Sequence, residues 1–205
     1  MKNKTTKLLI ILVLGALIFS ACAPSAAVPE SALEQVVNEE EAEMTDPIDL
    51  TYIKKDGIEV IYLAGGCFWG LEKLMQSLPG VVDVVSGYAN GKADIVPSYG
   101  SVSTGVTGYR ETVRVQYDPE VISLDAILFA YFHVIDPTIQ NQQGNDIGTQ
   151  YQTGVYYTDE ASRTTVERIA AIEGARHERF VVEIEPLERF YDAEEYHQDY
   201  LIKNP

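Results

Sequence analysis

The sequence predicts an α+β fold with a ferredoxin-like, split βαβ core, that is, a mixed sheet with helices on one face. Two observations indicate this class. Short runs rich in β-branched and aromatic residues alternate with segments whose apolar residues recur at helical spacing. These segments follow the order strand, helix, strand, strand, helix, strand, and an extra helix, an extra strand and a C-terminal segment come after them. We therefore expect one folded domain over residues 58–205.

The first expected unit is a strand, a tight turn and a helix. Residues 58–64 form a short run rich in β-formers, and the two glycines after them let the backbone turn tightly. A helix follows and ends at Pro79. Its apolar residues are Leu71, Leu74, Met75 and Leu78. Residues 81–88 then read as a second strand.

A long loop and an alternating strand come next. The loop, residues 92–108, is rich in Gly, Ser and Thr, and a loop of this length in a compact domain is often functional. In the strand, residues 109–117, side chains point alternately to two faces. The apolar face holds Val113, Val115 and Tyr117, and Glu111 is its polar exception.

Glu111 is therefore a candidate general acid. A carboxyl group desolvated on an apolar face has a raised pKa and stays protonated near neutrality, as a general acid requires. The alternative is a carboxylate near the start of the strand that reaches solvent or pairs with a nearby arginine. The pattern alone does not separate these two readings.

The second half of the domain continues the same succession of elements. Ser123 caps a helix that Asp136 and Pro137 end. A polar loop, residues 138–146, leads to a strand over residues 148–157. The remaining expected elements are a helix from Asp159 to about Gly174, a strand at residues 180–184 before Pro186, and a short last helix that Asp192 and Glu195 begin as a capping box.

Composition and charge exclude one class of partner. The 205 residues are 46% hydrophobic and carry a formal net charge of −16. Phosphate binding needs clustered Lys or Arg, and no such cluster occurs outside the first residues. We therefore expect no nucleic-acid partner.

The N-terminus has the features of an export signal. Lysines among the first seven residues precede an apolar stretch, residues 8–19, that is short for a membrane span and suited to a signal-peptide core. Small residues lead directly to Cys22, as at bacterial lipoprotein processing sites. We expect a signal peptide at residues 1–21, lipidation of Cys22, and an exported protein anchored through this lipid to the outer face of the cytoplasmic membrane. The alternative to this lipoprotein signal is an ordinary secretory signal. Residues 22–57 read as a flexible, acidic linker.

Cys67 is the candidate nucleophile. It lies where the first strand becomes a helix, and the unpaired backbone N–H groups of a helix N-terminus favour thiolate and lower the pKa of a cysteine. The alternative is a small buried hydrophobic residue, the usual fate of a free cysteine. Cys22 is the other cysteine of the sequence, and lipidation would block it, so we expect no intramolecular disulfide.

Metal binding has little support in the sequence. His133, His177 and His197 are widely spaced, and no cysteine pair accompanies them. A cysteine hydrolase or acyl transferase needs a histidine beside its nucleophile. His197 is available to serve Cys67 in this way, so that class stays open.

Six short motifs of the chain belong together. They are Gly66-Cys67-Phe68-Trp69-Gly70, Leu78-Pro79-Gly80-Val81, Gly87-Tyr88, Tyr117-Asp118-Pro119, Gln143-Gly144-Asn145-Asp146-x-Gly148-Thr149-Gln150-Tyr151 and Tyr196-His197-Gln198. With them, the chain from about residue 58 to its end resembles the A-type peptide methionine sulfoxide reductases. Enzymes of this kind return methionine sulfoxide to methionine, one enzyme for each sulfoxide epimer. The resemblance implies a reductase of methionine S-sulfoxide, free or in oxidised proteins and peptides, with residues 58–205 as its catalytic domain.

The resemblance also implies a role for each site residue. Cys67 attacks the sulfoxide sulfur, and Glu111 gives the proton. Tyr99 and Tyr151 donate hydrogen bonds to the sulfoxide oxygen, and Asp146 helps to order the site. The substrate-binding residues are Phe68, Trp69, Tyr99, Tyr151 and His197.

Several departures from the family pattern bear on activity. Tyr109 and Arg110 replace the usual neighbours of the acid, and Gln152 stands where an arginine is common. Ser103 replaces a cysteine of many relatives, and the sequence ends without a cysteine-bearing tail. We therefore expect reduction by an external thiol that belongs to a thioredoxin-like protein or a small molecule. We also expect a monomer with no bound cofactor. The alternative outside enzymes is a surface lipoprotein that binds methionine-rich peptides without catalysis.

Overall fold

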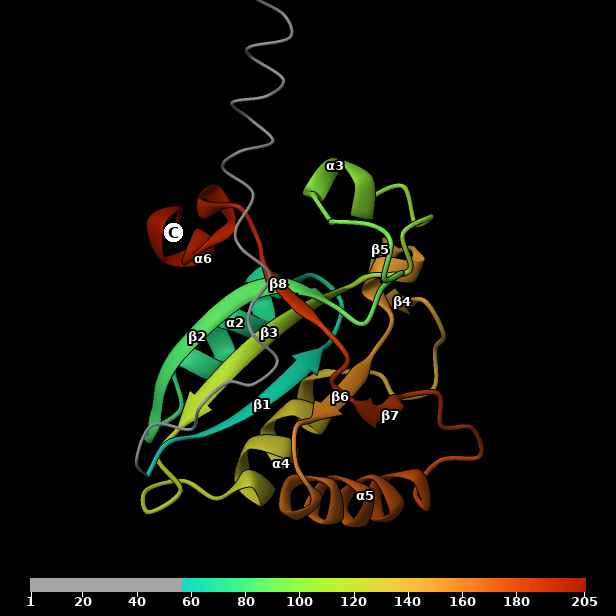
Figure 1. The fold of residues 1–205 in the computed structure, drawn as a ribbon. Coiled ribbons are helices and arrows are strands. Elements are labelled where there is room, and N and C mark those ends of the chain that lie inside the picture. Colours follow the sequence, from blue (N-terminus) through green and yellow to red (C-terminus); the bar gives the residue numbers. More distant parts are fainter. Residues whose placement is uncertain (1–56) are drawn as a thin grey trace, which may run out of the picture. The chain divides into compact units, whose positions relative to one another are not determined.

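The computed structural model describes residues 57–205 (Figure 1). The expected signal peptide, the lipidation site at Cys22 and all of the acidic linker but its last residue, Gly57, lie outside this range.

A six-stranded sheet forms the centre of the described part, with the strand order β7-β6-β1-β3-β2-β8. Its strands are β1 (Glu59–Ala64), β2 (Val81–Ala89), β3 (Arg110–Tyr117), β6 (Gly154–Tyr157), β7 (Glu183–Pro186) and β8 (Phe190–Asp192). β3 lies between β1 and β2 and is antiparallel to both, and β1 lies in the same way between β3 and β6. This arrangement is the predicted split βαβ topology, and the parallel pairing of β7 with β6 makes the sheet mixed.

The long helices cover one face of this sheet, as predicted (Figure 1). They are α2 (Phe68–Gln76), α4 (Leu124–Val134) and α5 (Glu160–Gly174). Ile61 and Leu63 of β1 belong to the main core with these helices, whereas Val60 and Tyr62 belong to a smaller apolar cluster on the other face. No helix within residues 57–205 is long and apolar enough to cross a bilayer.

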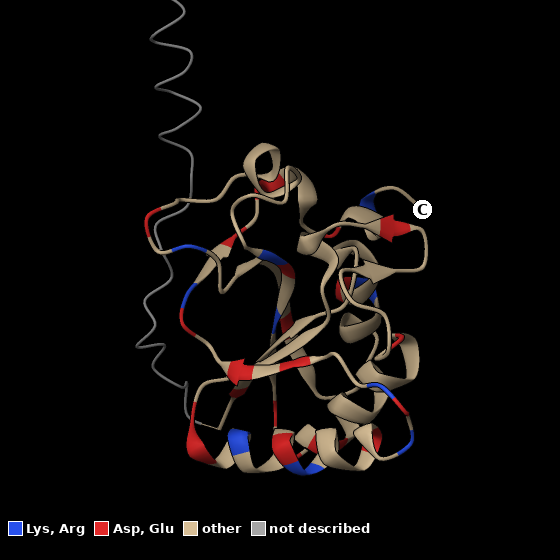
Figure 2. Cartoon of the chain, turned by 90° about the vertical axis from the view of Figure 1, so that its right-hand side faces the viewer, with Lys and Arg blue, Asp and Glu red and all other residues tan. Residues whose placement is uncertain are grey.

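Local capping signals place two helix starts where the sequence predicts them. The Ser123 side chain accepts a hydrogen bond from the backbone N–H of Ala126 at the start of α4. Asp159 and Ser162 form a reciprocal capping box at the start of α5. Acidic and basic residues both occur along α5 (Figure 2), so this helix is not uniformly basic.

The two long loops contain more structure than predicted. The helix α3 (Tyr99–Val102) interrupts residues 92–108, because Ser98 and Ser101 cap its first turn reciprocally. The polar loop contains a hairpin of β4 (Gln142–Gln143) and β5 (Asp146–Ile147). The strand expected over residues 148–157 begins only at Gly154, because a 3-10 turn, η1 (Thr149–Tyr151), precedes it.

The end of the chain also differs from the prediction. β7 begins at Glu183 rather than at residue 180, and it contains Pro186. An edge strand tolerates proline, because a missing N–H there interrupts no interior ladder. The three-residue strand β8 has no clear sequence pattern, and it is fixed by antiparallel pairing with β2.

The predicted capping box of Asp192 and Glu195 is wrong. A 3-10 turn, η2 (Glu195–His197), and the short helix α6 (Tyr200–Lys203) follow β8, and neither begins with a side-chain cap. Asp192 instead accepts a hydrogen bond from Arg114 of β3, and Glu195 accepts one from Lys203. A partner from a distant strand thus replaces the local one.

Candidate active site

Cys67 lies at the junction of β1 and α2, as the sequence predicts. It is the N-cap residue of α2 and is partly buried. The turn before it requires glycine, because Gly66 has φ +79° and a Cβ atom there would lie 2.6 Å from Cβ of Gln143. The close approach of the β4–β5 hairpin therefore constrains the path of the backbone from β1 to Cys67.

Glu111 is buried beside this junction. The residue is 3% exposed, and its Oε2 accepts a hydrogen bond of 3.1 Å from the backbone N–H of Phe68. Burial is the largest cause that raises the pKa of Glu111 to about 7. The hydrogen bond from the Phe68 N–H lowers this pKa, and the negative charge of Asp146 raises it by a smaller amount. The alternative of an arginine-paired carboxylate does not hold, since the neighbouring Arg110 pairs with Glu183.

The thiol of Cys67 differs from the expectation. Burial, and next the negative charge of Glu111, raise the pKa of Cys67 to about 11, so the predicted lowering is wrong. The backbone N–H groups of Trp69 and Gly70 act in the expected direction but are outweighed. Desolvation and a like charge exceed the effect of the helix N-terminus here. Cys67 therefore holds a thiol rather than a thiolate at neutral pH.

Aromatic rings gather around His197. The Phe68 ring lies 5.0 Å and the Tyr99 ring 4.6 Å from the imidazole, between centroids. The Trp69 indole N–H donates to Nδ1 of His197 at 3.1 Å. Because an indole N–H only donates, Nδ1 of His197 carries no proton. Burial also lowers the pKa of this imidazole, which favours its neutral form. His197 is thus held by Trp69 rather than by Cys67, and the hydrolase arrangement is not formed.

The two tyrosines and Asp146 lie close enough to Cys67 and Glu111 to affect one another electrostatically. Burial, and next the charge of Glu111, raise the pKa of Tyr99. The same causes in the same order raise the pKa of Tyr151 to about 12, so both phenols keep their protons at neutral pH. Asp146 and Cys67 also line a cavity of about 420 Å³ between α2 and the β4–β5 hairpin. The fold thus brings the predicted catalytic residues together.

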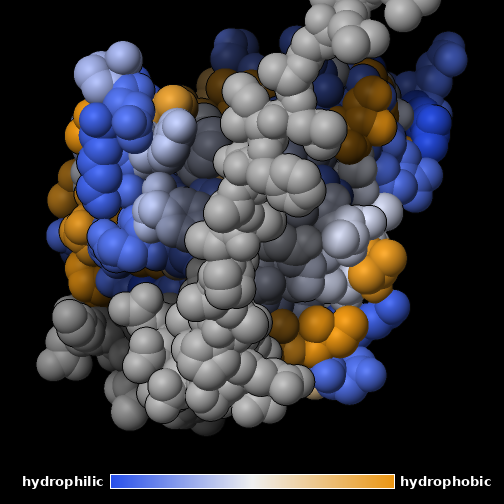
Figure 3. Space-filling view, turned by 90° about the horizontal axis from the view of Figure 1, so that it is seen from above, coloured by the Kyte–Doolittle hydropathy of each residue, from blue (hydrophilic) through white to orange (hydrophobic). Residues whose placement is uncertain are grey.

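The site lies at the end of the sheet that carries α3 and the C-terminal segment (Figure 1). Seen from that end, hydrophobic residues form separate groups among hydrophilic ones (Figure 3). Within residues 57–205, no group of three His, Cys, Asp or Glu side chains could hold a metal ion.

Residues 59–205 match the family model of peptide methionine sulfoxide reductase. The chain belongs to this family. The reductase is 48% identical over 146 residues to peptide methionine sulfoxide reductase MsrA from Clostridium botulinum strain Hall, an alignment that covers 71% of this chain and 92% of the relative. Its reaction is therefore the reduction of methionine sulfoxide.

Two solved structures of Mxr1 from Saccharomyces cerevisiae share the fold of this reductase. The reduced form is 38% identical with a TM-score of 0.70, over 76% of this chain and 91% of that chain. The form in complex with Trx2 is 27% identical with a TM-score of 0.53, over 74% and 94%.

Three residues that depart from the reductase pattern have defined positions in the structure. Gln152 is buried, accepts from the backbone N–H of Asn141 at 2.7 Å and donates to the carbonyl of Val181 at 2.8 Å, so it holds the η1 region rather than facing substrate. Tyr109 is buried too, and its O–H donates to the carbonyl of Ile95 at 3.0 Å. Ser103 ends α3 in an exposed position.

Sequence reasoning missed two side chains of this reductase that support the site. The Tyr200 ring stacks on the indole of Trp69, with centroids 3.7 Å apart and an angle of 10°. The carboxylate of Glu194 accepts hydrogen bonds of 2.8 Å from the backbone N–H of Tyr99 and from the O–H of Tyr88. Their partners are distant along the chain, so no local pattern indicates these contacts. The one sequence signal is that Glu194 and Tyr200 flank the motif that contains His197.

Proposed function

We propose that this enzyme reduces methionine S-sulfoxide by attack of the Cys67 thiolate on sulfur while Glu111 protonates the sulfoxide oxygen. The observation that carries this proposal is the buried Glu111, whose pKa of about 7 lets it hold and release a proton beside Cys67 at neutral pH. The hydrogen bond from Phe68, the first residue of α2, keeps the acid and the nucleophile in one fixed arrangement.

The protons and electrons of this step balance within the pair. The thiol of Cys67 gives its proton to the carboxylate of Glu111, and Glu111 passes it to the sulfoxide oxygen as the sulfur is attacked. The attack forms a bond between the two sulfur atoms. The protonated oxygen then passes to the sulfur of Cys67 as this S–S bond and the substrate S–O bond break, so Cys67 becomes a sulfenic acid and methionine leaves. Two electrons move from the cysteine sulfur to the methionine sulfur, so the step consumes no cofactor.

Other residues of the site bind the substrate in this proposal. Tyr99 and Tyr151 donate hydrogen bonds to the oxygen as negative charge develops on it, since their raised pKa values keep both phenols protonated. Phe68 and Trp69 receive the methyl group of the substrate. The remaining roles are the ordering of the site by Asp146 and a substrate contact by His197, the residue that holds Trp69.

We also propose that an external thiol restores the enzyme. A sulfenic acid condenses with a thiol to a disulfide, which a second thiol then reduces. Cys67 is the one cysteine among the described residues, so no partner thiol lies within residues 57–205. The solved complex of Mxr1 with Trx2 supports a thioredoxin-like protein as the reductant. We expect the enzyme to act as a monomer.

The N-terminal sequence supports a proposal on location. We infer an exported lipoprotein, cleaved before Cys22, whose acidic linker at residues 22–57 connects the anchor to the catalytic domain at residues 58–205. Mass spectrometry of the native N-terminus tests this. Diacylglyceryl-modified Cys22 is expected, and retained Met1 or an unmodified N-terminus beyond Cys22 contradicts it.

The reaction itself is tested by a single turnover. One equivalent of a peptide with methionine S-sulfoxide should give one equivalent of methionine peptide, and Cys67 should then react with a sulfenic-acid reagent. Cys67→Ser should give no product, because the attacking sulfur is gone. Tight peptide binding without product in the wild-type protein would instead support the non-catalytic binding lipoprotein.

A further inference from the structure

The C-terminal segment, residues 194–200, connects two walls of the proposed substrate site. Near its start, Oε1 of Glu194 accepts the backbone N–H of Tyr99 at 2.8 Å. Three residues later, Nδ1 of His197 accepts the indole N–H of Trp69 at 3.1 Å. One short segment therefore holds both α3, which carries a proposed donor to the substrate, and the start of α2.

Glu194 completes the first turn of α3. The first N–H groups of a helix have no acceptor within the helix. The side chain of Ser98 accepts the N–H of Ser101, whereas the N–H of Tyr99 donates to Glu194. Among the hydrogen bonds of the described residues, this is the one that joins the first turn of α3 to another element.

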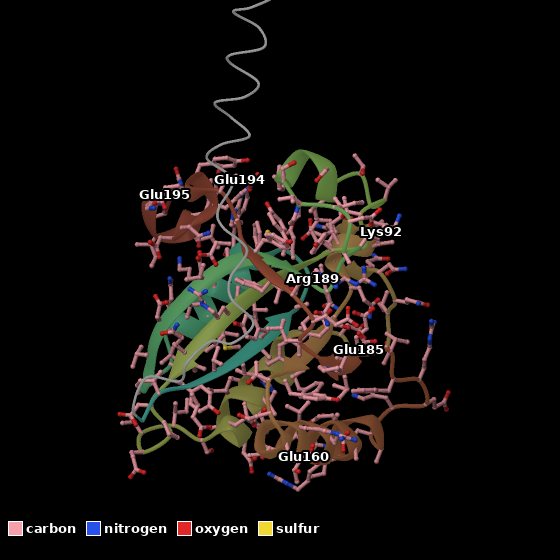
Figure 4. The ribbon with its side chains drawn as sticks, in the orientation of Figure 1. Lys92, Glu160, Glu185, Arg189, Glu194 and Glu195 are labelled. Carbon is pink, nitrogen blue, oxygen red and sulfur yellow. The ribbon has the colours of Figure 1, made fainter. Side chains whose placement is uncertain are left out.

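The second oxygen of Glu194 is held from the sheet. The O–H of Tyr88, a buried residue of β2, donates to Oε2 at 2.8 Å, and Nε2 of His197 lies 3.9 Å from the same oxygen. Figure 4 shows Glu194 on the side of the segment toward α3 and Glu195 farther from it. The carboxylate is therefore fixed at both oxygens and joins the sheet to the backbone of α3.

We propose that Glu194 is a positioning residue that holds Tyr99 where its phenolic O–H meets the sulfoxide oxygen. This inference rests on the proposed role of Tyr99. Glu194 uses its oxygens on protein groups, so it acts through Tyr99 rather than on the substrate. Displacement of a catalytic group by about 1 Å costs on the order of 10²-fold in rate, and loss of this anchor frees the first residue of α3.

Three variants test the proposal by steady-state kinetics. Glu194→Ala is expected to lower kcat by about 10- to 100-fold and to change KM much less, because the interaction with Tyr99 matters most in the transition state. Glu194→Gln should keep most of the activity, since its amide oxygen can accept from Tyr99 and its NH₂ can donate to Tyr88. Glu195→Ala is the matched control, because that side chain is 89% exposed and pairs with the exposed Lys203. An unchanged kcat in folded Glu194→Ala overturns the proposal.

A double-mutant cycle separates positioning from general structural support. In a Tyr99→Phe background, Glu194→Ala should lower kcat by less than about twofold, because the hydroxyl it positions is absent. The same large loss in both backgrounds overturns the proposal. If Glu194→Ala does not fold, Tyr88→Phe replaces it, since that change removes only the anchor of Oε2 and should lower kcat to a smaller extent. No loss in Tyr88→Phe would then overturn the proposal.

Hydrogen exchange gives a readout that needs no substrate. The amide of Tyr99 should exchange faster in Glu194→Ala than in the wild type, Glu194→Gln or Glu195→Ala, because its acceptor is lost. Unchanged exchange overturns the anchoring role even if the enzyme is active. Absence of sulfoxide reduction by the wild type, with the expected change in exchange, would instead contradict the proposed function alone.

Discussion

Cys67 and Glu111 share one proton in the proposed reactive state. The pair with a Cys67 thiolate and a protonated Glu111 holds one proton, as does the pair with a Cys67 thiol and an ionised Glu111. Each of these two forms therefore reaches its highest population between the two pKa values of the pair. These pKa values are about 11 for Cys67 and about 7 for Glu111. We expect kcat/KM to be level between about pH 7 and pH 11 and to fall below pH 7, where both groups are protonated. A pH profile of sulfoxide reduction measures this.

Glu111→Gln should remove this behaviour. At neutral pH its rate should be about 10²- to 10⁴-fold below that of the wild type, the range expected for loss of a general acid. The fall below pH 7 should be replaced by a steady rise with pH, because the thiol now ionises without a proton acceptor beside it. A wild-type profile in this variant would exclude Glu111 as the acid.

The same carboxyl group lowers stability at neutral pH. Its pKa rises from 4.5 to about 7 on folding, so the stability it contributes is fully present below pH 4.5 and is lost as pH rises through 7. Glu111→Gln should therefore be more stable than the wild type by about 3 kcal/mol at pH 8, with little difference near pH 4. Denaturant unfolding at both pH values checks this, and equal stability at pH 8 contradicts it.

Among the elements, the turn between β1 and α2 depends most on one residue. Gly66→Ala places a methyl group at positive φ and against Gln143, so it should destabilise the protein by about 1–3 kcal/mol and displace Cys67. The matched control is Gly70→Ala within α2, where a Cβ meets no atom within 4 Å. That change should stabilise the protein by about 0.5–1 kcal/mol. Unfolding midpoints decide the comparison, and equal midpoints for the two variants contradict it.

Sequence patterns predicted those elements whose signals are local. The cap at Ser123, the helix start at Asp159 and the alternation in β3 depend on neighbouring residues, and the structure confirms them. The strand β8 and the partner of Asp192 depend on β2 and on Arg114, which are far away along the chain. No pattern within a few residues carries that information.

At the scale of the whole molecule, the site shows the same division. The sequence singled out Cys67 at a helix start and Glu111 on the apolar face of a strand, and the structure places Glu111 against the first residue of the helix that Cys67 caps. The pKa of Cys67 was predicted in the wrong direction, because burial and the charge of Glu111 arise only when separate strands meet. The support by Glu194 was missed for the same reason, since its partner Tyr99 lies 95 residues away.

The contact between Trp69 and His197 has a consequence for the order of folding. It joins residues 128 positions apart, and contacts across such long loops form late because closing the loop costs entropy first. Trp69 is the one tryptophan of the sequence, so its fluorescence reports when the C-terminal segment docks. In stopped-flow refolding, we expect the fluorescence change to lag behind the recovery of far-UV circular dichroism, and simultaneous changes would contradict this. A chain synthesised only as far as β8 would already carry Cys67, but not yet the histidine that holds its aromatic neighbour in place.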